Sequence, residues 1–120
     1  MNPLHVISTA VLFLLVAGFA SRANRERHRA LMLTAFALDL AVVVWIETTR
    51  HAVEKVAGGV PPVVAIHAAI STAVLLCYVA MIALGGKIFA GRPELRVFHR
   101  NLGITFAALR GLNYLTSFLV

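Results

Sequence analysis

Four long apolar segments, separated by short clusters of charged residues, restrict what this chain of 120 residues can fold into. The segments are residues 4–20, 30–49, 60–84 and 98–120. A helix of about 20 apolar residues crosses the hydrocarbon core of a bilayer, and lipid offers the backbone no hydrogen bonds, so each segment should be helical. The sequence therefore predicts an all-α integral membrane protein, a single transmembrane domain of four helices in an up-down-up-down bundle.

The composition supports this fold class. Hydrophobic residues make up 60% of the chain and charged residues 13%, whereas soluble domains average about 45–50% and about 25%. A soluble helical core would have no polar surface to cover it. Together with the single cysteine, Cys77, these values exclude a soluble globular enzyme, a disordered tail and a disulfide-stapled scaffold.

The basic residues predict the orientation in the membrane. Most of them fall in two short stretches, which contain Arg22, Arg25, Arg27 and Arg29, and Lys87, Arg92, Arg96 and Arg100. By the positive-inside rule both stretches face the cytoplasm, so the N- and C-termini and residues 50–60 lie outside. We therefore expect a multi-pass protein of the inner, cytoplasmic membrane. Orientation and anionic lipid account for the net charge of +6, and no motif suggests nucleic-acid binding.

One alternative applies to the first segment, which resembles a secretory signal peptide in its length. Gly18-Phe19-Ala20 is a small-residue pattern of the kind found at cleavage sites. However, the basic cluster follows the apolar stretch instead of preceding it, which is the reverse of a signal peptide. We expect this segment to stay in the membrane as the first helix.

Two charged residues are expected at the centre of the bilayer. With 1.5 Å of rise per residue, Asp39 and Arg110 reach depths that agree within roughly 2 Å. An unpaired charge at that depth would cost at least about 2.5–3.5 kcal/mol. The sequence thus predicts a structural ion pair between Asp39 and Arg110, and a proton-relay carboxylate at Asp39 is the alternative.

Two sets of side chains are candidate ligands, because five histidines are many for so short a chain. The expected outer set, a candidate metal site, is His5, Glu47, His51 and His67. Imidazole and carboxylate ligands suit zinc, copper or iron. The expected inner set, a candidate cofactor site, is His28, His99 and Met32. Imidazole and thioether ligands suit Cu(I) or haem, and a hydrogen-bonded interfacial histidine without any ligand is the alternative in each case.

Other features of the sequence are less specific. Pro61-Pro62 is expected to begin the third helix and Gly85-Gly86 to end it. No residue pattern typical of a catalytic site or a phosphate-binding loop occurs, so we do not expect an enzyme. No broken helix pair suggests a transporter, although a second copy of the chain could supply further helices.

The histidines also carry a family resemblance. His28-Arg29 with Met32, then His51, His67 and His99-Arg100, resemble the pattern of the small membrane proteins called domain of unknown function 420, the YozB-like or CtaM-like proteins. The resemblance covers about residues 28–115. Residues 105–110 depart from it, because the family has a stretch rich in Trp and Tyr there. The resemblance implies a four-helix membrane protein that helps to mature a haem–copper oxidase, or a small subunit of a respiratory complex.

Three classes of function follow from these observations. The first is a metal- or haem-binding helper of oxidase assembly. The second is an electron-transfer cytochrome, against which His28 and His51 stand roughly 34 Å apart along one helix. The third is a cofactor-free accessory subunit, for which the many small residues in all four segments would allow close helix contacts.

Overall fold

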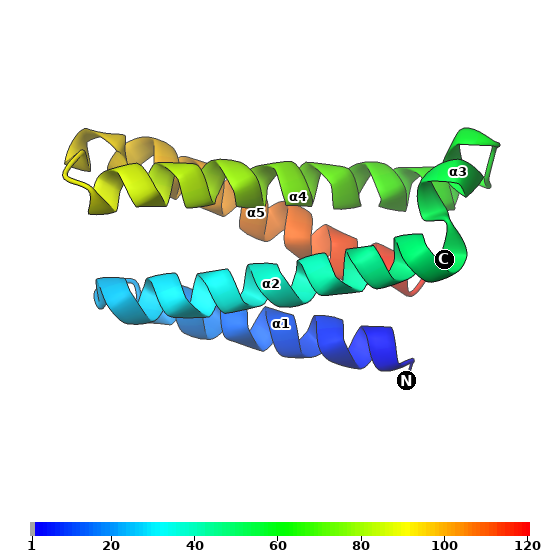
Figure 1. Ribbon diagram of the computed structural model, residues 1–120, viewed down its shortest axis with the longest axis horizontal. Coiled ribbons are helices and arrows are strands. Elements are labelled where there is room, and N and C mark those ends of the chain that lie inside the picture. Colours follow the sequence, from blue (N-terminus) through cyan, green and yellow to red (C-terminus); the bar gives the residue numbers. More distant parts are fainter. Residues whose placement is uncertain (1) are drawn as a thin grey trace. The chain divides into compact units, whose positions relative to one another are not determined.

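The computed structural model describes residues 2–120 and consists of helices joined by short turns and loops (Figure 1). In chain order the elements are α1 (Pro3–Ala20), α2 (Arg25–Arg50), α3 (Ala52–Ala57), α4 (Pro62–Phe89), the 3-10 turn η1 (Pro93–Leu95) and α5 (Arg96–Ser117). No strand occurs within these residues. The all-α prediction with four long helices is confirmed.

The chain forms two compact units that meet in sequence between Gly58 and Gly59. In the first unit α1 packs along α2, with α3 following, and in the second α4 packs along α5. Each unit is therefore a helical hairpin, with its two long helices antiparallel and joined by a short turn. The assembly of the two hairpins into one four-helix bundle stays a prediction.

Three of the four long helices, α1, α2 and α4, are long and apolar enough to cross a membrane. The fourth predicted span, α5, is not among them. Its length is not the reason, because α5 has 22 residues and α1 has 18. Polar residues lower the hydropathy of α5, namely Arg96, His99, Arg100, Asn101, Arg110 and Asn113.

The helix ends follow local capping chemistry. The Oδ1 atoms of Asn2 and Asn24 accept hydrogen bonds from the first-turn amides of α1 and α2, at 2.8 and 3.1 Å. Pro62 begins α4, as the sequence predicts. The prediction that Gly85-Gly86 ends this helix is wrong, because α4 continues to Phe89. The chain then turns at Gly91, whose φ of 108° favours glycine.

The segment after α2 holds a short helix that the sequence analysis did not predict. His51 adopts the left-handed conformation, with φ 51° and ψ 52°, which ends α2 and redirects the chain into α3. The Glu47 Oε2 atom accepts a hydrogen bond of 3.0 Å from the Val53 amide. Glu47 thus satisfies an amide in the first turn of α3 that has no partner within the helix.

A close contact holds the α1–α2 hairpin together near its turn. Gly18, Leu15 and Val11 are the buried residues of α1, and Ala35 is the buried residue of α2. A Cβ atom on Gly18 would lie 3.0 Å from Met32 Cε. The missing side chain of Gly18 therefore lets Met32 lie against the backbone of α1.

Candidate functional site

Several polar side chains of the second hairpin lie along one line between its two helices, which we call the α4–α5 seam. Seam residues recur every three or four positions, as expected for helices that pack nearly antiparallel. On α4 the seam comprises His67, Ser71, Val74, Tyr78, Met81 and Gly85. On α5 it comprises His99, Gly103, Phe106, Arg110, Asn113 and Thr116. The contacts described below cross this seam.

We call the end of a hairpin that holds its turn the closed end, and the other end the open end. At the open end of the α4–α5 hairpin, His67 is hydrogen-bonded to the opposite helix. Its Nδ1 atom lies 2.7 Å from Thr116 Oγ1. The Thr116 hydroxyl donates its proton to the Leu112 carbonyl at 2.8 Å, so it accepts the bond from His67. Nδ1 therefore carries the ring proton when the imidazole is neutral, and Nε2 carries the lone pair.

A second bond crosses the seam one turn further in. The Asn113 amide Nδ2 donates to Ser71 Oγ, and Ser71 Oγ in turn donates to the His67 carbonyl at 2.8 Å. We call His67, Ser71, Asn113 and Thr116 the polar cluster. It links both helices through side chains at two successive turns, which is how polar residues hold helices together in lipid.

The middle of the seam combines aromatic packing with a buried charge. The rings of Tyr78 and Phe106 pack with centroids 4.6 Å apart, and both residues are buried. Arg110, one turn beyond Phe106, is only 2% exposed. By contrast, Ile104 and Leu115 on the other side of α5 are 62% and 63% exposed. In this middle part of α5, the charged residue is thus buried, and large apolar residues on the other side of the helix are exposed.

At the closed end of each hairpin, a histidine packs on a glycine of the preceding helix. His28 Nδ1 lies 2.7 Å from the Gly18 carbonyl oxygen, which can only accept, so Nδ1 donates. A Cβ atom on Gly85 would lie 3.4 Å from His99 Cε1. Both histidines are half-buried. The methionine predicted beside His28, Met32, contacts the same glycine, Gly18.

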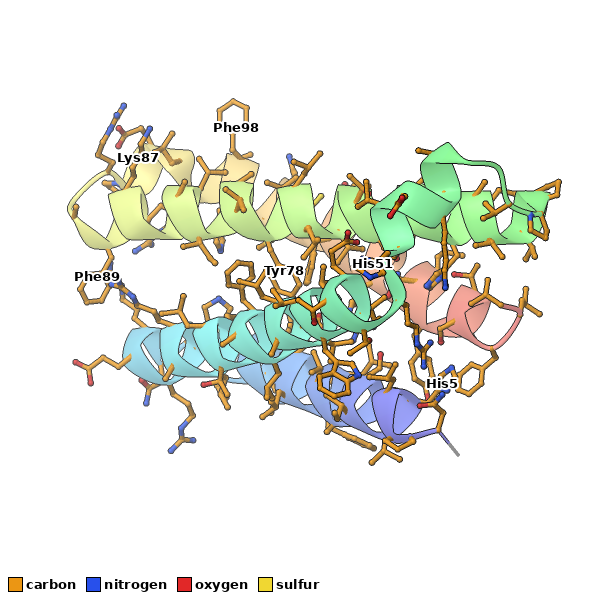
Figure 2. The ribbon with its side chains drawn as sticks, turned by 45° about the vertical axis from the view of Figure 1, so that its right-hand side comes forward. His5, His51, Tyr78, Lys87, Phe89 and Phe98 are labelled. Atoms are coloured by element: carbon orange, nitrogen blue, oxygen red, sulfur yellow. The ribbon has the colours of Figure 1, made fainter. Side chains whose placement is uncertain are left out.

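The predicted outer set is divided between the hairpins. His5, Glu47 and His51 belong to the first hairpin, and Figure 2 shows His5 and His51 toward its open end. His67 belongs to the second. Within residues 2–120 no group of three or more His, Cys, Asp or Glu side chains is arranged to hold a metal ion. A four-ligand metal site therefore stays a prediction.

The predicted histidine pair and the predicted ion pair are likewise divided between the two hairpins. His28 and Asp39 lie in the first hairpin, and His99 and Arg110 in the second. Asp39 is half-buried and lies four residues after the buried Ala35, on the same side of α2. The histidine pair and the ion pair remain predictions.

Sequence reasoning missed most of the polar cluster. It singled out His67 but not Ser71, Asn113 or Thr116. A signal was present, because polar and small residues recur at seam spacing in residues 67–85 and 99–116. The signal was weak, because in lipid-facing helices the usual contrast between apolar and polar faces is absent.

Basic residues surround both closed ends. In the first turn, Arg22 Nη1 donates to the Phe19 carbonyl at 3.2 Å, and its guanidinium lies 4.7 Å from the centre of the Phe19 ring. In the second, Arg92 Nε donates to Glu94 Oε1 at 2.9 Å. This hydrogen bond lowers the pKa of the Glu94 carboxyl, which is exposed to solvent.

No family model, curated protein or solved structure matches this chain. The resemblance of its histidine pattern to the domain of unknown function 420 therefore rests on the quoted residues alone. The structure by itself supports a small helical protein with three candidate membrane-spanning helices.

Proposed function

We propose that this chain is a multi-pass membrane protein whose histidines bind a metal ion or haem, and that it acts as a helper in the maturation of a haem–copper oxidase. The observation that carries the proposal is the orientation of two imidazoles. His28 and His67 each donate Nδ1–H to an oxygen on the neighbouring helix of their hairpin. Metal-binding histidines are typically held in this way, because the bond fixes the ring and directs the Nε2 lone pair to the metal.

The membrane part of the proposal includes α5 as a fourth span. α1, α2 and α4 have the length and hydropathy for spanning. α5 buries Arg110 and exposes Ile104 and Leu115, the reverse of a helix on a water-soluble protein. This distribution favours lipid as the solvent of α5, since intramembrane charges face the protein interior.

The residues that would bind are those of the two predicted sets. On the outer side these are His5, Glu47, His51 and His67, which suit zinc, copper or iron. On the inner side they are His28, His99 and Met32, which suit Cu(I) or haem. A bound metal or haem would be the cargo handed to the oxidase, and the protein would hold and shield it. Glu47 already accepts a bond from the Val53 amide, which fixes its carboxylate.

The partner is proposed from the family resemblance. His28, His51, His67 and His99 follow the family's order, and that family is linked to oxidase maturation. The bilayer, a respiratory complex and a second copy of the chain are the partners that such a helper would meet.

An optical spectrum combined with metal analysis tests the proposal on the detergent-purified protein. We expect a Soret band, or stoichiometric copper, zinc or iron, that is lost from one of two variants. These are His51→Ala with His67→Ala, and His28→Ala with His99→Ala. Ser71→Ala is the matched control, because it alters the polar cluster but removes no imidazole. A protein that stays colourless and metal-free after loading with haem and with each metal contradicts the proposal.

The second candidate function is a cofactor-free accessory subunit of a respiratory membrane complex. It is favoured by the same hydrogen bonds, because the polar cluster and the His28–Gly18 contact hold helices together without any ligand. In that case the histidine variants lower stability, and no spectrum or metal content changes. An electron-transfer cytochrome, by contrast, would show a haem spectrum that changes reversibly on reduction.

A further inference from the structure

The same five-residue pattern begins the second helix of each hairpin. It reads Arg-x-x-His-Arg and comprises Arg25, His28 and Arg29 in one hairpin and Arg96, His99 and Arg100 in the other. α2 begins at Arg25 and α5 begins at Arg96. The pattern therefore occupies the same structural position twice, directly after the turn that closes each hairpin.

The local packing is also alike in the two hairpins. His28 and His99 are half-buried and contact Gly18 and Gly85 of the preceding helix. The arginines on either side of each histidine are exposed. Residues four apart lie on one side of a helix, so each segment presents two guanidinium groups close together at the surface.

This arrangement places like charges close together at the start of each helix. Like charges four residues apart on a helix repel each other, and cations near a helix N-terminus oppose the helix dipole. Each closed end also carries four basic residues and one acidic residue, Glu26 or Glu94. In the second hairpin that acid is already paired with Arg92. A bound anion would relieve the repulsion in both places.

The position of the two Arg-x-x-His-Arg segments relative to the apolar helices indicates which anion they bind. α1 and α4 are candidate membrane spans, and they end at Ala20 and Phe89, a few residues before the two patterns. Phe19, Phe89 and Phe98 are exposed around the closed ends, and Figure 2 shows Phe89 and Phe98 at the closed end of the α4–α5 hairpin. Exposed phenylalanines combined with arginines are typical of segments that lie at the boundary between lipid headgroups and acyl chains.

We propose that each Arg-x-x-His-Arg segment binds the phosphate of an anionic phospholipid, with one site per hairpin. Guanidinium groups bind phosphate oxygens in pairs, and the histidine positions them by anchoring the helix start against the preceding glycine. The site rests on the membrane location proposed above but does not depend on metal or haem binding, so its test and the metal and haem test can fail separately.

Native mass spectrometry of the full chain in detergent, with added phosphatidylglycerol or phosphatidylcholine, tests this inference. We expect two phosphatidylglycerol molecules per chain to be retained in preference to phosphatidylcholine. Arg25→Gln with Arg29→Gln should leave one, Arg96→Gln with Arg100→Gln should leave one, and all four changes should leave none. For each site, the loss of two arginine contacts should weaken binding by about tenfold or more.

Two controls keep the result interpretable. Arg50→Gln with Lys55→Gln removes the same charge at the other end of α2 and in α3, and should leave both lipids bound. Arg25→Lys with Arg29→Lys keeps the charge but loses the paired guanidinium bonds, so it should bind the lipid more weakly than the unmodified chain and more strongly than the glutamine variant. Circular dichroism should show unchanged helix content in all variants.

Three results would overturn the proposal. One is equal retention of phosphatidylglycerol and phosphatidylcholine by the unmodified chain. Another is a loss of lipid in the Arg50 and Lys55 control as large as in the arginine variants. The third is displacement of phosphatidylglycerol by millimolar inorganic phosphate, which would identify a soluble phosphate as the ligand.

Discussion

His67 shows how one side chain can serve both the fold and a site. Its Nδ1 atom donates a hydrogen bond across the hairpin to Thr116, and the Thr116 hydroxyl donates one to the Leu112 carbonyl of its own helix. The imidazole is thereby oriented, whether or not a ligand binds to Nε2. Hydrogen bonds between membrane helices contribute about 0.6 kcal/mol on average and at most about 1.7 kcal/mol.

The bond between His67 and Thr116 should be measurable by a double-mutant cycle. We expect Thr116→Val and His67→Phe each to destabilise the α4–α5 hairpin, with a coupling of about 0.5–1.5 kcal/mol between them. Unfolding of the full chain in mixed micelles gives the free energies. Thr105→Val is the matched control, since this exposed hydroxyl bonds only to its own helix at the Asn101 carbonyl. Strictly additive effects would contradict the hydrogen bond.

Glu94 offers a pH test outside the membrane helices. Its hydrogen bond from Arg92 lowers the pKa of the carboxyl below its ordinary value. The pair's contribution is therefore present above the unfolded-state pKa and is lost as the pH falls through the lowered folded-state pKa. Arg92→Gln should raise the Glu94 pKa back toward its ordinary value in an NMR titration. Arg96→Gln should change it much less, and an equal change in both variants would argue against the pairing.

The two hairpins owe their close helix contacts to glycines placed opposite methionines. A Cβ atom on Gly103 would lie 3.2 Å from Met81 Cε, and one on Gly18 would lie 3.0 Å from Met32 Cε. Neither glycine has the positive φ that would require it in a turn. Their role is thus steric, and they let a flexible thioether fill the space beside the backbone.

This packing predicts a substitution and its rescue. Gly103→Leu should destabilise the α4–α5 hairpin by about 1–3 kcal/mol, because the added side chain overpacks against Met81. Met81→Ala in the same chain should restore most of that loss. Gly111→Leu on the same helix is the control and should be far milder, since nothing lies within 4 Å of its Cβ position. Equal losses in the two glycine variants would contradict the close contact at Gly103.

The helices themselves could largely be predicted from the sequence, whereas their ends and partners could not. The lengths of the apolar segments correctly predicted all four long helices, and Pro62 correctly predicted the start of α4. The prediction that α4 ends at Gly85 failed, because this glycine packs against His99 within the helix. α3 was missed because it depends on His51 taking a left-handed conformation and on Glu47 reaching the Val53 amide.

The candidate site, too, could be predicted only in part from the sequence. Depth along each helix can be calculated from the sequence, so His67, Asp39 and Arg110 stood out as polar groups in apolar segments. Rotation about the helix axis cannot be calculated in this way, because lipid-facing positions are apolar like the core. The hydrogen-bond partners of His67 and Ser71 on α5 therefore emerged only from the structure.

The predicted ion pair between Asp39 and Arg110 can be tested in the whole chain. Arg110 is buried and Asp39 is half-buried, and they belong to different hairpins. We expect Asp39→Asn combined with Arg110→Gln to cost less unfolding free energy than either single change, because each single change strands one charge. The comparison uses the same mixed-micelle unfolding assay. A double variant whose loss equals the sum of the single losses would contradict the pair.

The most direct test of the account is whether α5 lies in lipid with its polar seam turned inward. Single cysteines are introduced at Ile104 and Leu112, in a chain carrying Cys77→Ala, and labelled with a membrane-impermeant maleimide in intact membranes. Arg22→Cys, in the turn between α1 and α2, and Lys55→Cys, in α3, serve as reference positions at opposite ends of the first hairpin. We predict that Ile104→Cys and Leu112→Cys stay unlabelled until the membrane is dissolved, while the two references label from opposite sides. Ready labelling of Ile104→Cys or Leu112→Cys in intact membranes would contradict a fourth membrane-spanning helix.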